Sequence, residues 1–595
     1  MNETVMVSNN TWQWYREAIR SWLEDPGVVE YQGLNMTALK MDQAYMVADS
    51  EVDVGVYSVS DDCFRCPFEL QKIIKAGTEG SWVVDTAHRS SWRVYHSSER
   101  YISATNMTGL VCQARPDLGQ FGVYRLNATD EACSVRTLRE PVDIYMPLLL
   151  LLGVLLGTWV VYGVVRFIMS RVWRTGKLRY GDKELAIQQR LRALDTFRGM
   201  AIVFMIFVND GAGGYWWLEH ATWNGLTAGD LVFPSFLWIM GVCIPLSVKG
   251  AFAKGVPRWK IFLHIVRRSC IMFLLGVALN TIAGRNTLSQ IRVFGVLQRL
   301  AVAYFVAAGF YALTAPKYFT PPRGACGQAL KDVLSCVWCW ALAGALVAVH
   351  TVITFVVHDP DSYYIIIHYT STTHLVTSYR YLGPGGKHDD WAAPECSGGA
   401  AGYIDRLILG SSHLFQWTDR RQVYGGQHTD PEGLLGCLTS AVQALLGVQA
   451  GATVLLQRSH KARLSRWLAW GLVFALAGAL LTGFSREHGV VPINKNLWSI
   501  SFVLVTTSFC LVLLVLCYLF TDAWRLWGGG PFRAPGLNAI ALYVGHMVCY
   551  NMFPFHWKVA NMETHTINLL EAVWGTALWV VIAHVMAKKK VFISL

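Results

Sequence analysis

The sequence predicts a polytopic α-helical membrane protein with about 11 transmembrane helices and a small β-rich, disulfide-bonded N-terminal domain. Of its 595 residues, 53% are hydrophobic and only 15% are charged, whereas soluble proteins carry roughly 25% charged residues. Apolar runs of about 20 residues, long enough to span a bilayer, recur after residue 143 and are missing before it. This distribution excludes a disordered chain, a fibrous chain and an ordinary cytosolic enzyme.

The N-terminal region, residues 1–143, is predicted to form the β-rich domain. It is net acidic, with 13 basic and 20 acidic residues. Apolar and polar residues alternate in 51–62 and in 121–129, which is the pattern of half-buried strands. All N-x-S/T glycosylation sites of the chain fall in this region, which indicates a lumenal or extracellular side. They are Asn2, Asn9, Asn35, Asn106 and Asn127.

Four cysteines of the same region, Cys63, Cys66, Cys112 and Cys133, predict two disulfides. Three connectivities are possible, and the sequence does not choose between them. The Cys63–Cys66 spacing also fits half of a zinc site or a redox pair. The region lacks the second half of a zinc site, so we favour a structural disulfide. The role of Cys396, a fifth cysteine predicted on the lumenal side, stays open.

The first transmembrane helix is predicted at 144–165, an uncharged run. The next segment, 166–198, holds nine basic and three acidic residues. Because Lys and Arg collect on the cytosolic side of membranes, this loop is expected in the cytosol and the N-terminal domain in the lumen. The remaining residues, 199–595, are predicted to form a ten-helix transmembrane domain. Its expected spans are 199–214, 226–248, 261–283, 293–315, 334–357, 433–456, 467–484, 497–519, 536–553 and 568–587.

Alternation of these spans places the other basic loops in the cytosol, together with a C-terminus that carries Lys588, Lys589 and Lys590. The net charge of +11 therefore reflects membrane topology, and we expect no nucleic-acid partner. One predicted lumenal loop, 358–432, is long and rich in Gly, Pro, Asp and aromatic residues. Loops of this length are usually functional or folded, so we expect part of a lid over the bundle.

Two polar side chains flank a glycine-rich turn at the lumenal end of the second predicted span. The run starts at Asn209, passes Gly211, Gly213 and Gly214, and reaches His220. Glycines let the backbone approach a ligand or a helix closely. An ionisable residue beside a span favours a functional site. The alternative is a histidine anchored at the headgroup level in an aromatic belt, and the spacing alone leaves both interpretations open.

Charged residues also occur inside spans or at their mouths. Arg198 and Asp195 lie at the cytosolic end of the second predicted span. We consider two roles for them: a ligand site, or an Asp–Arg pair that anchors the helix end on the cytosolic side. Gln298 and Arg299 lie in the lumenal half of another span, where an arginine needs a partner or a cavity. The alternative to a functional role for Arg299 is a structural ion pair, for which Asp230 is the candidate partner.

A further polar cluster surrounds a lysine at the lumenal end of a later span. The alternative to a binding role is helix capping by Asn496. The cluster consists of Asn494, Lys495, Asn496, Trp498 and Ser499.

His546 is a single histidine in the middle of a predicted span, and we interpret it as a packed, hydrogen-bonded side chain rather than a catalyst. Serine-hydrolase elbows, nucleotide-binding P-loops and the H-E-x-x-H metal motif are absent from the sequence. We expect no metal ion and no permanently bound cofactor.

Eight blocks of the sequence, taken in order, resemble the lysosomal heparan-α-glucosaminide N-acetyltransferase family. The first block also resembles the wider transmembrane acyltransferase superfamily. The resemblance covers about residues 190–595 and is weaker in the N-terminal domain. The combination is highly specific, although no single block is. The blocks are LDTFRG, FVNDGAGGYWWLEHATWNGLTAGDLVFP, GVLQRL, YLGPGG, GGAAGYIDRLILG, DPEGLLG, NKNLWS and YVGHM.

The resemblance implies a reaction in which acetyl from cytosolic acetyl-CoA, the co-substrate, passes to the free amine of a terminal α-glucosamine of heparan sulfate in the lysosomal lumen. It implies a lysosomal membrane location, a homodimer, a catalytic His220 and an active-site Asn209. The other polar residues then become candidates for binding acetyl-CoA or the sugar chain: Gln298, Arg299, Asn494, Lys495, Asn496, Trp498, Ser499, His546, Asp230, Arg198 and Arg406.

The chemistry of the two predicted catalytic side chains agrees with this reaction. Attack of an amine on a thioester passes through an oxyanion, which the Asn209 amide is suited to stabilise. His220 could accept the amine proton in an acidic lumen, or accept the acetyl group itself. The sequence does not separate direct transfer from this two-step route. Two other functions are considered: a transporter of an anionic solute, against which the lack of an internal repeat counts, and an O-acetyltransferase for another glycan.

Overall fold

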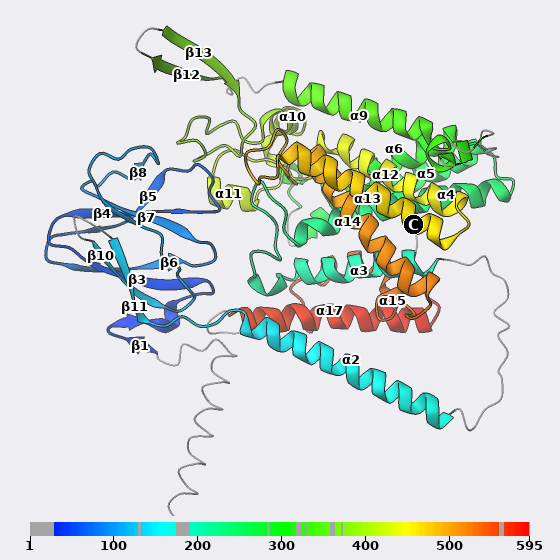
Figure 1. Ribbon diagram of the computed structural model, residues 1–595, viewed down its shortest axis with the longest axis horizontal. Coiled ribbons are helices and arrows are strands. Elements are labelled where there is room, and N and C mark those ends of the chain that lie inside the picture. Colours follow the sequence, from blue (N-terminus) through cyan, green and yellow to red (C-terminus); the bar gives the residue numbers. More distant parts are fainter. Residues whose placement is uncertain are drawn as a thin grey trace, which may run out of the picture.

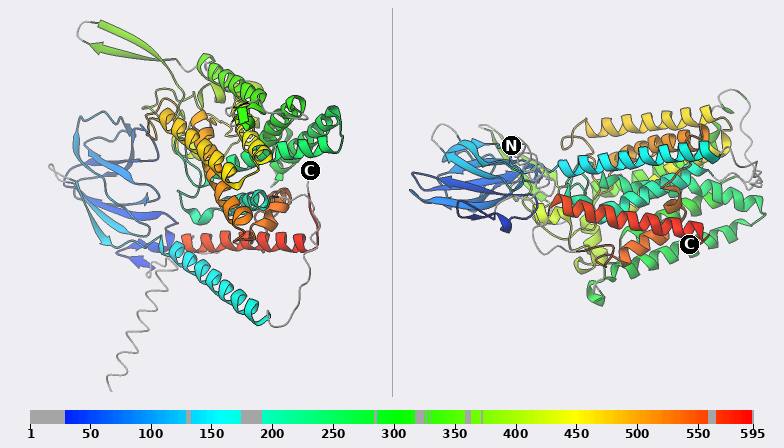
Figure 2. Two further views of the ribbon diagram at one scale, coloured as in Figure 1. Left: turned by 45° about the vertical axis from the view of Figure 1, so that its right-hand side comes forward. Right: turned by 90° about the horizontal axis from the view of Figure 1, so that it is seen from below.

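A β-sheet domain caps one end of a bundle of helices (Figure 1). The right-hand view in Figure 2, seen from below, shows the same arrangement, with the sheets beyond the helix ends and the long helices running away from them. The computed structural model describes residues 29–128, 133–173, 191–282, 286–316, 324, 327–328, 330–357, 363–370, 373–557 and 564–593.

The N-terminal domain is rich in β-strands, as the alternating sequence predicted, and its strands form two sheets that pack face to face. One sheet has four strands in the order β11-β10-β3-β6, and the other has five in the order β8-β5-β4-β7-β9. Alternate residues, such as Met46 and Ala48 from one sheet and Val54 and Val56 from the other, meet in one apolar core. The strands are β3 (Gln43–Asp49), β4 (Val54–Ser60), β5 (Phe68–Ile74), β6 (Glu79–Asp85), β7 (Ser90–Tyr95), β8 (Tyr101–Ile102), β9 (Leu110–Ala114), β10 (Val123–Ala128) and β11 (Cys133–Arg139), with β1 (Glu30–Tyr31), β2 (Leu34–Asn35) and the 3-10 turn Met36–Ala38 at the start.

Both predicted disulfides are confirmed, and the structure decides their pairing. Cys63 bonds to Cys66 in the loop after β4, and Cys112 bonds to Cys133. The second bond joins β9 to β11, and therefore one sheet to the other. Cross-linking residues 21 positions apart in the sequence stabilises the folded domain by roughly 3 kcal/mol in the chain-entropy view.

The described glycosylation sites have accessible side chains. Asn35, Asn106 and Asn127 are all exposed on the β domain. Asn2 and Asn9 lie outside the described residues. A surface position is what a bulky glycan requires, so the three described asparagines stay candidate acceptors.

The helical fold class is confirmed. Within the described ranges, nine helices are long and apolar enough to cross a bilayer. They coincide with nine of the predicted spans. These helices are α2 (Met146–Trp173), α4 (Val232–Ala253, extended at its start by the 3-10 turn Gly229–Leu231), α5 (Arg258–Asn280), α6 (Val296–Thr314), α9 (Val337–Val356), α12 (Gly436–Leu456), α13 (His460–Thr482), α14 (Ile500–Tyr518, continued by the π turn Leu519–Ala523) and α17 (His565–Lys588).

The other two predicted spans differ from the helices found. In place of 199–214, the structure has α3 (Arg192–Asn209), which begins seven residues earlier and ends where the glycine-rich turn starts. In place of a continuous 536–553 it has the short helices α15 (Arg533–Leu537) and α16 (Ala539–Val548). Asn538 breaks the helix between them with φ −124°. Both α3 and the α15–α16 pair pack inside the bundle, where their polar residues find protein partners.

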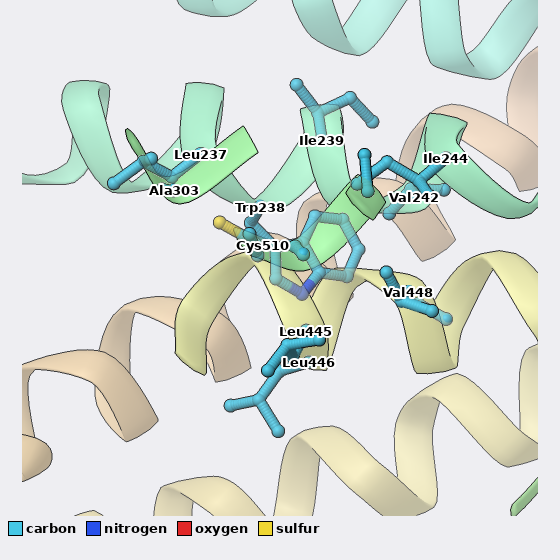
Figure 3. Close-up of a cluster of buried hydrophobic side chains, with 14 of the residues drawn as sticks. Leu237, Trp238, Ile239, Val242, Ile244, Ala303, Leu445, Leu446, Val448 and Cys510 are labelled. Carbon is cyan, nitrogen blue, oxygen red and sulfur yellow. The ribbon is translucent and has the colours of Figure 1, made fainter. Parts of the chain in front are cut away.

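Helices α4 and α12 form the centre of the bundle, and small residues bring them close together. A Cβ at Gly447 would collide with the carbonyl of Trp238, and one at Gly451 with that of Val242. Glycine at these positions therefore allows backbone contact between helices, as in many membrane proteins. Figure 3 shows the side chains around this contact, with Leu237 and Trp238 from α4 near Leu445 and Leu446 from α12.

The predicted lumenal loop 358–432 is partly folded. Its described parts include the hairpin β12–β13, which projects outward (Figure 1), and two short helices. The segment after the hairpin contacts the β domain. The Tyr424 hydroxyl accepts from the Phe64 N–H and donates to the Asp62 carbonyl, both at 3.0 Å. Cys396 is fully buried in this loop. The elements are β12 (Tyr363–Thr370), β13 (Thr373–Arg380), α10 (Gly399–Leu409), the 3-10 turn Ser411–His413 and α11 (Asp419–Tyr424); elsewhere α8 (Lys331–Leu334) and the turns Ala212–Gly214 and Leu288–Gln290 complete the fold.

Candidate active site

His220 and Asp230 form a hydrogen-bonded pair at the end of the bundle that the β domain covers. His220 Nδ1 lies 3.0 Å from Asp230 Oδ1; the histidine side chain is 38% exposed and the aspartate is fully buried. Because a carboxylate only accepts hydrogen bonds, Nδ1 carries the proton and Nε2 keeps a lone pair in the neutral ring. Gly229 makes this approach possible, since a Cβ there would lie 3.0 Å from His220 Nδ1. The histidine is thus oriented with a basic nitrogen available.

Asp230 is held on its other sides by neighbouring groups. Its Oδ2 accepts from the Ala221 N–H at 3.2 Å and from the Thr227 hydroxyl at 2.9 Å. Lys495 Nζ lies 3.3 Å from Asp230 Oδ1. Lys495 balances the carboxylate charge, so the neutral form of His220 can donate to Asp230 without an uncompensated buried anion.

The predicted polar cluster around Lys495 docks directly on the segment after His220. Asn494 Nδ2 donates to Asn224 Oδ1 at 3.0 Å, and Asn496 Nδ2 donates to the Thr222 carbonyl at 3.1 Å. The expected cap by Asn496 is wrong: Ser499 caps α14, accepting from the Phe502 N–H. The cluster therefore braces the His220 segment, which is why Lys495 reaches Asp230.

Asn209, the last residue of α3, is exposed and pairs with His546 of α16. Asn209 Nδ2 lies 2.8 Å from His546 Nε2, and His546 Nδ1 lies 3.2 Å from the Leu542 carbonyl. His546 is 2% exposed, as the interpretation of a packed histidine expected. The carbonyl contact places its proton on Nδ1, so Asn209 donates one amide hydrogen to Nε2 and keeps a second one for another acceptor.

Gln298 and Arg299 are buried beneath this region. Gln298 Nε2 donates to the Val293 carbonyl at 3.0 Å. Arg299 Nη2 donates to the Gly433 carbonyl at 3.0 Å, and its guanidinium lies 4.8 Å from the centre of the Trp498 ring. The expected pairing of Arg299 with Asp230 is therefore wrong, because His220 and Lys495 occupy Asp230. Arg406, another of the candidate binding residues, donates to the Ser397 carbonyl at 2.9 Å.

A cavity of about 800 Å³ runs between α3, α4, α5, α6 and α16. Its walls are mainly apolar. On α3 it reaches Met205, one helical turn before Asn209, and on α16 it reaches Tyr543, three residues before His546. On α4 it reaches Phe233, three residues after Asp230. On these helices the cavity therefore ends about one turn, or roughly 5 Å along the axis, from Asn209, from His546 and from Asp230, the partner of His220.

The other end of the cavity is basic. Arg198, predicted at this mouth, lies in its wall and donates to the Gly536 carbonyl at 3.4 Å. Lys254 and Lys260 lie in the wall where α4 ends and α5 begins. Arg268, ten residues into α5, lies 4.8 Å from the centre of the Tyr304 ring. Arg268 is not among the residues predicted from the sequence, although a charge inside an apolar span is the signal that could have identified it.

No group of three or more His, Cys, Asp or Glu side chains is arranged as a metal site within the residues that the structure describes.

The sequence is similar to known proteins of one family. Residues 190–335, which include α3, the His220 segment and most of the cavity wall, match the family described as heparan-alpha-glucosaminide N-acetyltransferase, catalytic. The mouse heparan-alpha-glucosaminide N-acetyltransferase is 35% identical over 93% of this chain and 89% of its own length. The human protein of the same name is 35% identical over 93% of this chain and 88% of its own. The chain therefore belongs to the heparan-α-glucosaminide N-acetyltransferase family.

Proposed function

We propose that this protein transfers acetyl from acetyl-CoA to the amine of a terminal α-glucosamine of heparan sulfate, and that the two substrates approach from opposite ends of the bundle. The cavity carries this proposal. It has a basic mouth at one end of the helices and ends one turn from Asn209 and Asp230 at the other. A thioester that enters at the basic mouth would bring its acetyl group to the side where His220 is exposed.

The chemistry of the cavity wall suits acetyl-CoA. Lys254, Lys260 and Arg198 supply cations for the phosphates, and Arg268 supplies another farther along the wall. The apolar middle section between α4 and α6 suits the pantetheine arm, which needs space and few hydrogen bonds. Acetyl-CoA acts here as a co-substrate that leaves as CoA after each turnover.

His220 is the proposed acceptor of the proton that the attacking amine loses. Asp230 fixes the ring with Nδ1 protonated, so Nε2 faces the reactants as a base. The same Nε2 could first take the acetyl group, forming an acetyl-imidazole that the amine then cleaves. Asn209 has an amide hydrogen left after its bond to His546, and this donor would stabilise the oxyanion.

The proposed setting is the lysosomal membrane, with the β domain in the lumen and the C-terminus in the cytosol. The basic loops and the exposed acceptor asparagines support this orientation. The homodimer that the resemblance implies stays a prediction.

Sealed vesicles test the reaction and its sidedness together. Purified protein is reconstituted with labelled acetyl-CoA on the basic-mouth side and an α-glucosaminide on the β-domain side. Labelled amide on the glucosaminide supports the proposal. Label on a sugar hydroxyl would indicate an O-acetyltransferase, and unreacted solute crossing the membrane would indicate a transporter; either result contradicts the proposal.

A bulky side chain in the cavity is expected to weaken acetyl-CoA binding. Met240 lies in the wall on α4, and Met240→Trp should raise the KM for acetyl-CoA about tenfold or more, because the indole occupies space needed by the pantetheine arm. Steady-state kinetics with varied acetyl-CoA measure the change. Leu263→Trp on α5, at a side chain 55% exposed on the outside of the bundle, serves as the matched control and should keep the wild-type KM. An unchanged KM in Met240→Trp would place acetyl-CoA elsewhere.

A further inference from the structure

The turn between the two candidate catalytic residues is clamped by the β domain. Residues 211–214 follow Asn209 and adopt left-handed backbone angles, including φ 90° at Gly211 and 78° at Gly213. A Cβ at Gly214 would collide with the side chain of Met41, which belongs to the β domain. The position of His220 relative to Asn209 therefore depends on how this turn is held.

His565, the first residue of α17, connects the turn to the β domain. Its Nδ1 lies 2.8 Å from the Gly213 carbonyl, and its Nε2 lies 2.9 Å from Asp42 Oδ1. The ring is 1% exposed and stacks on Tyr215, with ring centres 4.5 Å apart. A carbonyl and a carboxylate oxygen both accept and neither donates, so both ring nitrogens must carry protons for both bonds to form. The geometry fits the imidazolium form.

The Asp42 side of this joint is rigid. Its backbone N–H donates to Gln120 Oε1 at 3.0 Å, and its carbonyl accepts from the Thr86 N–H at 2.8 Å. The backbone at Asp42 is therefore held by contacts that do not involve His565.

Two described carboxyl groups, those of Glu219 and Asp85, face the ion pair. Burial raises the pKa of the Glu219 carboxyl, the charges of Asp419 and Asp42 raise it further, and His565 lowers it. Asp85 faces Asp42. Tyr215 is the neutral neighbour over the ring, and its hydroxyl donates to the Ile144 carbonyl at 2.7 Å. These carboxyl groups favour a cation at His565.

We propose that His565 is an acid-dependent positioning residue: its imidazolium ties the Gly213 carbonyl to Asp42 and so holds the turn that sets Asn209 and His220 in their catalytic arrangement. When the ring loses a proton, one nitrogen faces an acceptor without a hydrogen and that bond is lost. Histidine changes charge between about pH 5 and 8, so the joint is complete in an acidic compartment and loosened at neutral pH. This role rests on the proposed transferase function, which it extends to regulation by lumenal pH.

The test replaces the Asp42 carboxylate with an amide, which can form a hydrogen bond with either protonation state of His565. In Asp42→Asn, the amide can donate to a neutral Nε2 or accept from a protonated one, while Nδ1 still donates to Gly213. Hydrogen–deuterium exchange of peptides covering 211–215 is measured on the full-length protein at pH 5 and pH 7 and corrected for intrinsic exchange. In the wild type, the equilibrium constant for opening of the turn should be about ten- to hundred-fold larger at pH 7 than at pH 5. In Asp42→Asn, this constant should be nearly equal at both pH values.

Asp49→Asn, at the exposed last position of β3, the strand that follows Asp42, is the matched control and should keep the wild-type pH dependence. In the transfer assay, kcat of Asp42→Asn should fall less between pH 5 and pH 7 than kcat of wild type. The inference is overturned if the turn of the wild type opens equally at pH 5 and pH 7. It is also overturned if exchange of the turn in Asp49→Asn does not change with pH. These exchange results stand apart from the transferase activity, so absence of acetyl transfer with pH-dependent exchange would refute the proposed function and leave the clamp in place.

Discussion

Replacing His220 with alanine is expected to abolish acetyl transfer, with kcat/KM falling by about 10⁴-fold or more. The imidazole Nε2 is the group that takes the amine proton or the acetyl group, and alanine can do neither. Binding of CoA should persist, because the cavity wall ends short of His220. Transfer is measured as labelled acetyl amide, and CoA binding by equilibrium binding to the purified variant.

His96→Ala provides the matched control, since this β-domain histidine is exposed and distant in sequence from the site. It should retain wild-type turnover. If His220→Ala keeps more than about a tenth of the activity, the catalytic assignment is wrong, because general-base removal alone costs about 10²-fold or more.

The same pair of proteins separates the two chemical routes. Labelled acetyl-CoA is added without acceptor, and the protein is isolated under denaturing conditions. Label retained on wild type and lost in His220→Ala indicates the acetyl-imidazole route, whereas an unlabelled but active wild type indicates direct transfer.

Asp230→Asn is expected to lower kcat by about 10³- to 10⁴-fold while leaving the fold intact. The amide matches the carboxylate in shape, but its NH₂ group would donate to His220 Nδ1 and force the proton onto Nε2. The ring would then present a proton where the reaction needs a lone pair. Steady-state kinetics of the purified variant, together with its melting temperature, measure the effect.

Asp419→Asn is the control for charge removal on the same side of the bundle, since this side chain is exposed in the first turn of α11. Its kcat should stay within about twofold of wild type, as expected for a substitution at an exposed surface position. A kcat within tenfold of wild type in Asp230→Asn would mean that His220 does not depend on Asp230 for its tautomer.

The sequence predicted features that depend on local pattern. The strands around residues 54–60 and 123–128 followed from two-residue alternation, and nine of the expected spans from continuous apolar runs. Cysteine number and context predicted two disulfides, but only the packing of the two sheets brings Cys112 beside Cys133.

Contacts between distant segments could not be read in the same way. Lys495 reaches Asp230 because the 494–496 segment docks on the loop after His220, a contact over more than 250 positions of sequence. Arg299 and Asp230 looked like partners because each is a charge at the lumenal end of a span, yet Arg299 turns to the Gly433 carbonyl. The sequence pattern therefore identifies the charged residues that need partners, but the partners themselves are determined by the packing of distant segments.

The cavity among α3–α6 and α16 has a consequence for inherited or engineered defects in this chain. An inert molecule that fills this space would bind the folded form and not the unfolded one. At a hundredfold excess over its dissociation constant it would add about 2.7 kcal/mol to the free energy of unfolding. Variants weakened elsewhere, such as at the Gly447 and Gly451 helix contacts, would thus be rescued by a pharmacological chaperone that never touches the damaged position.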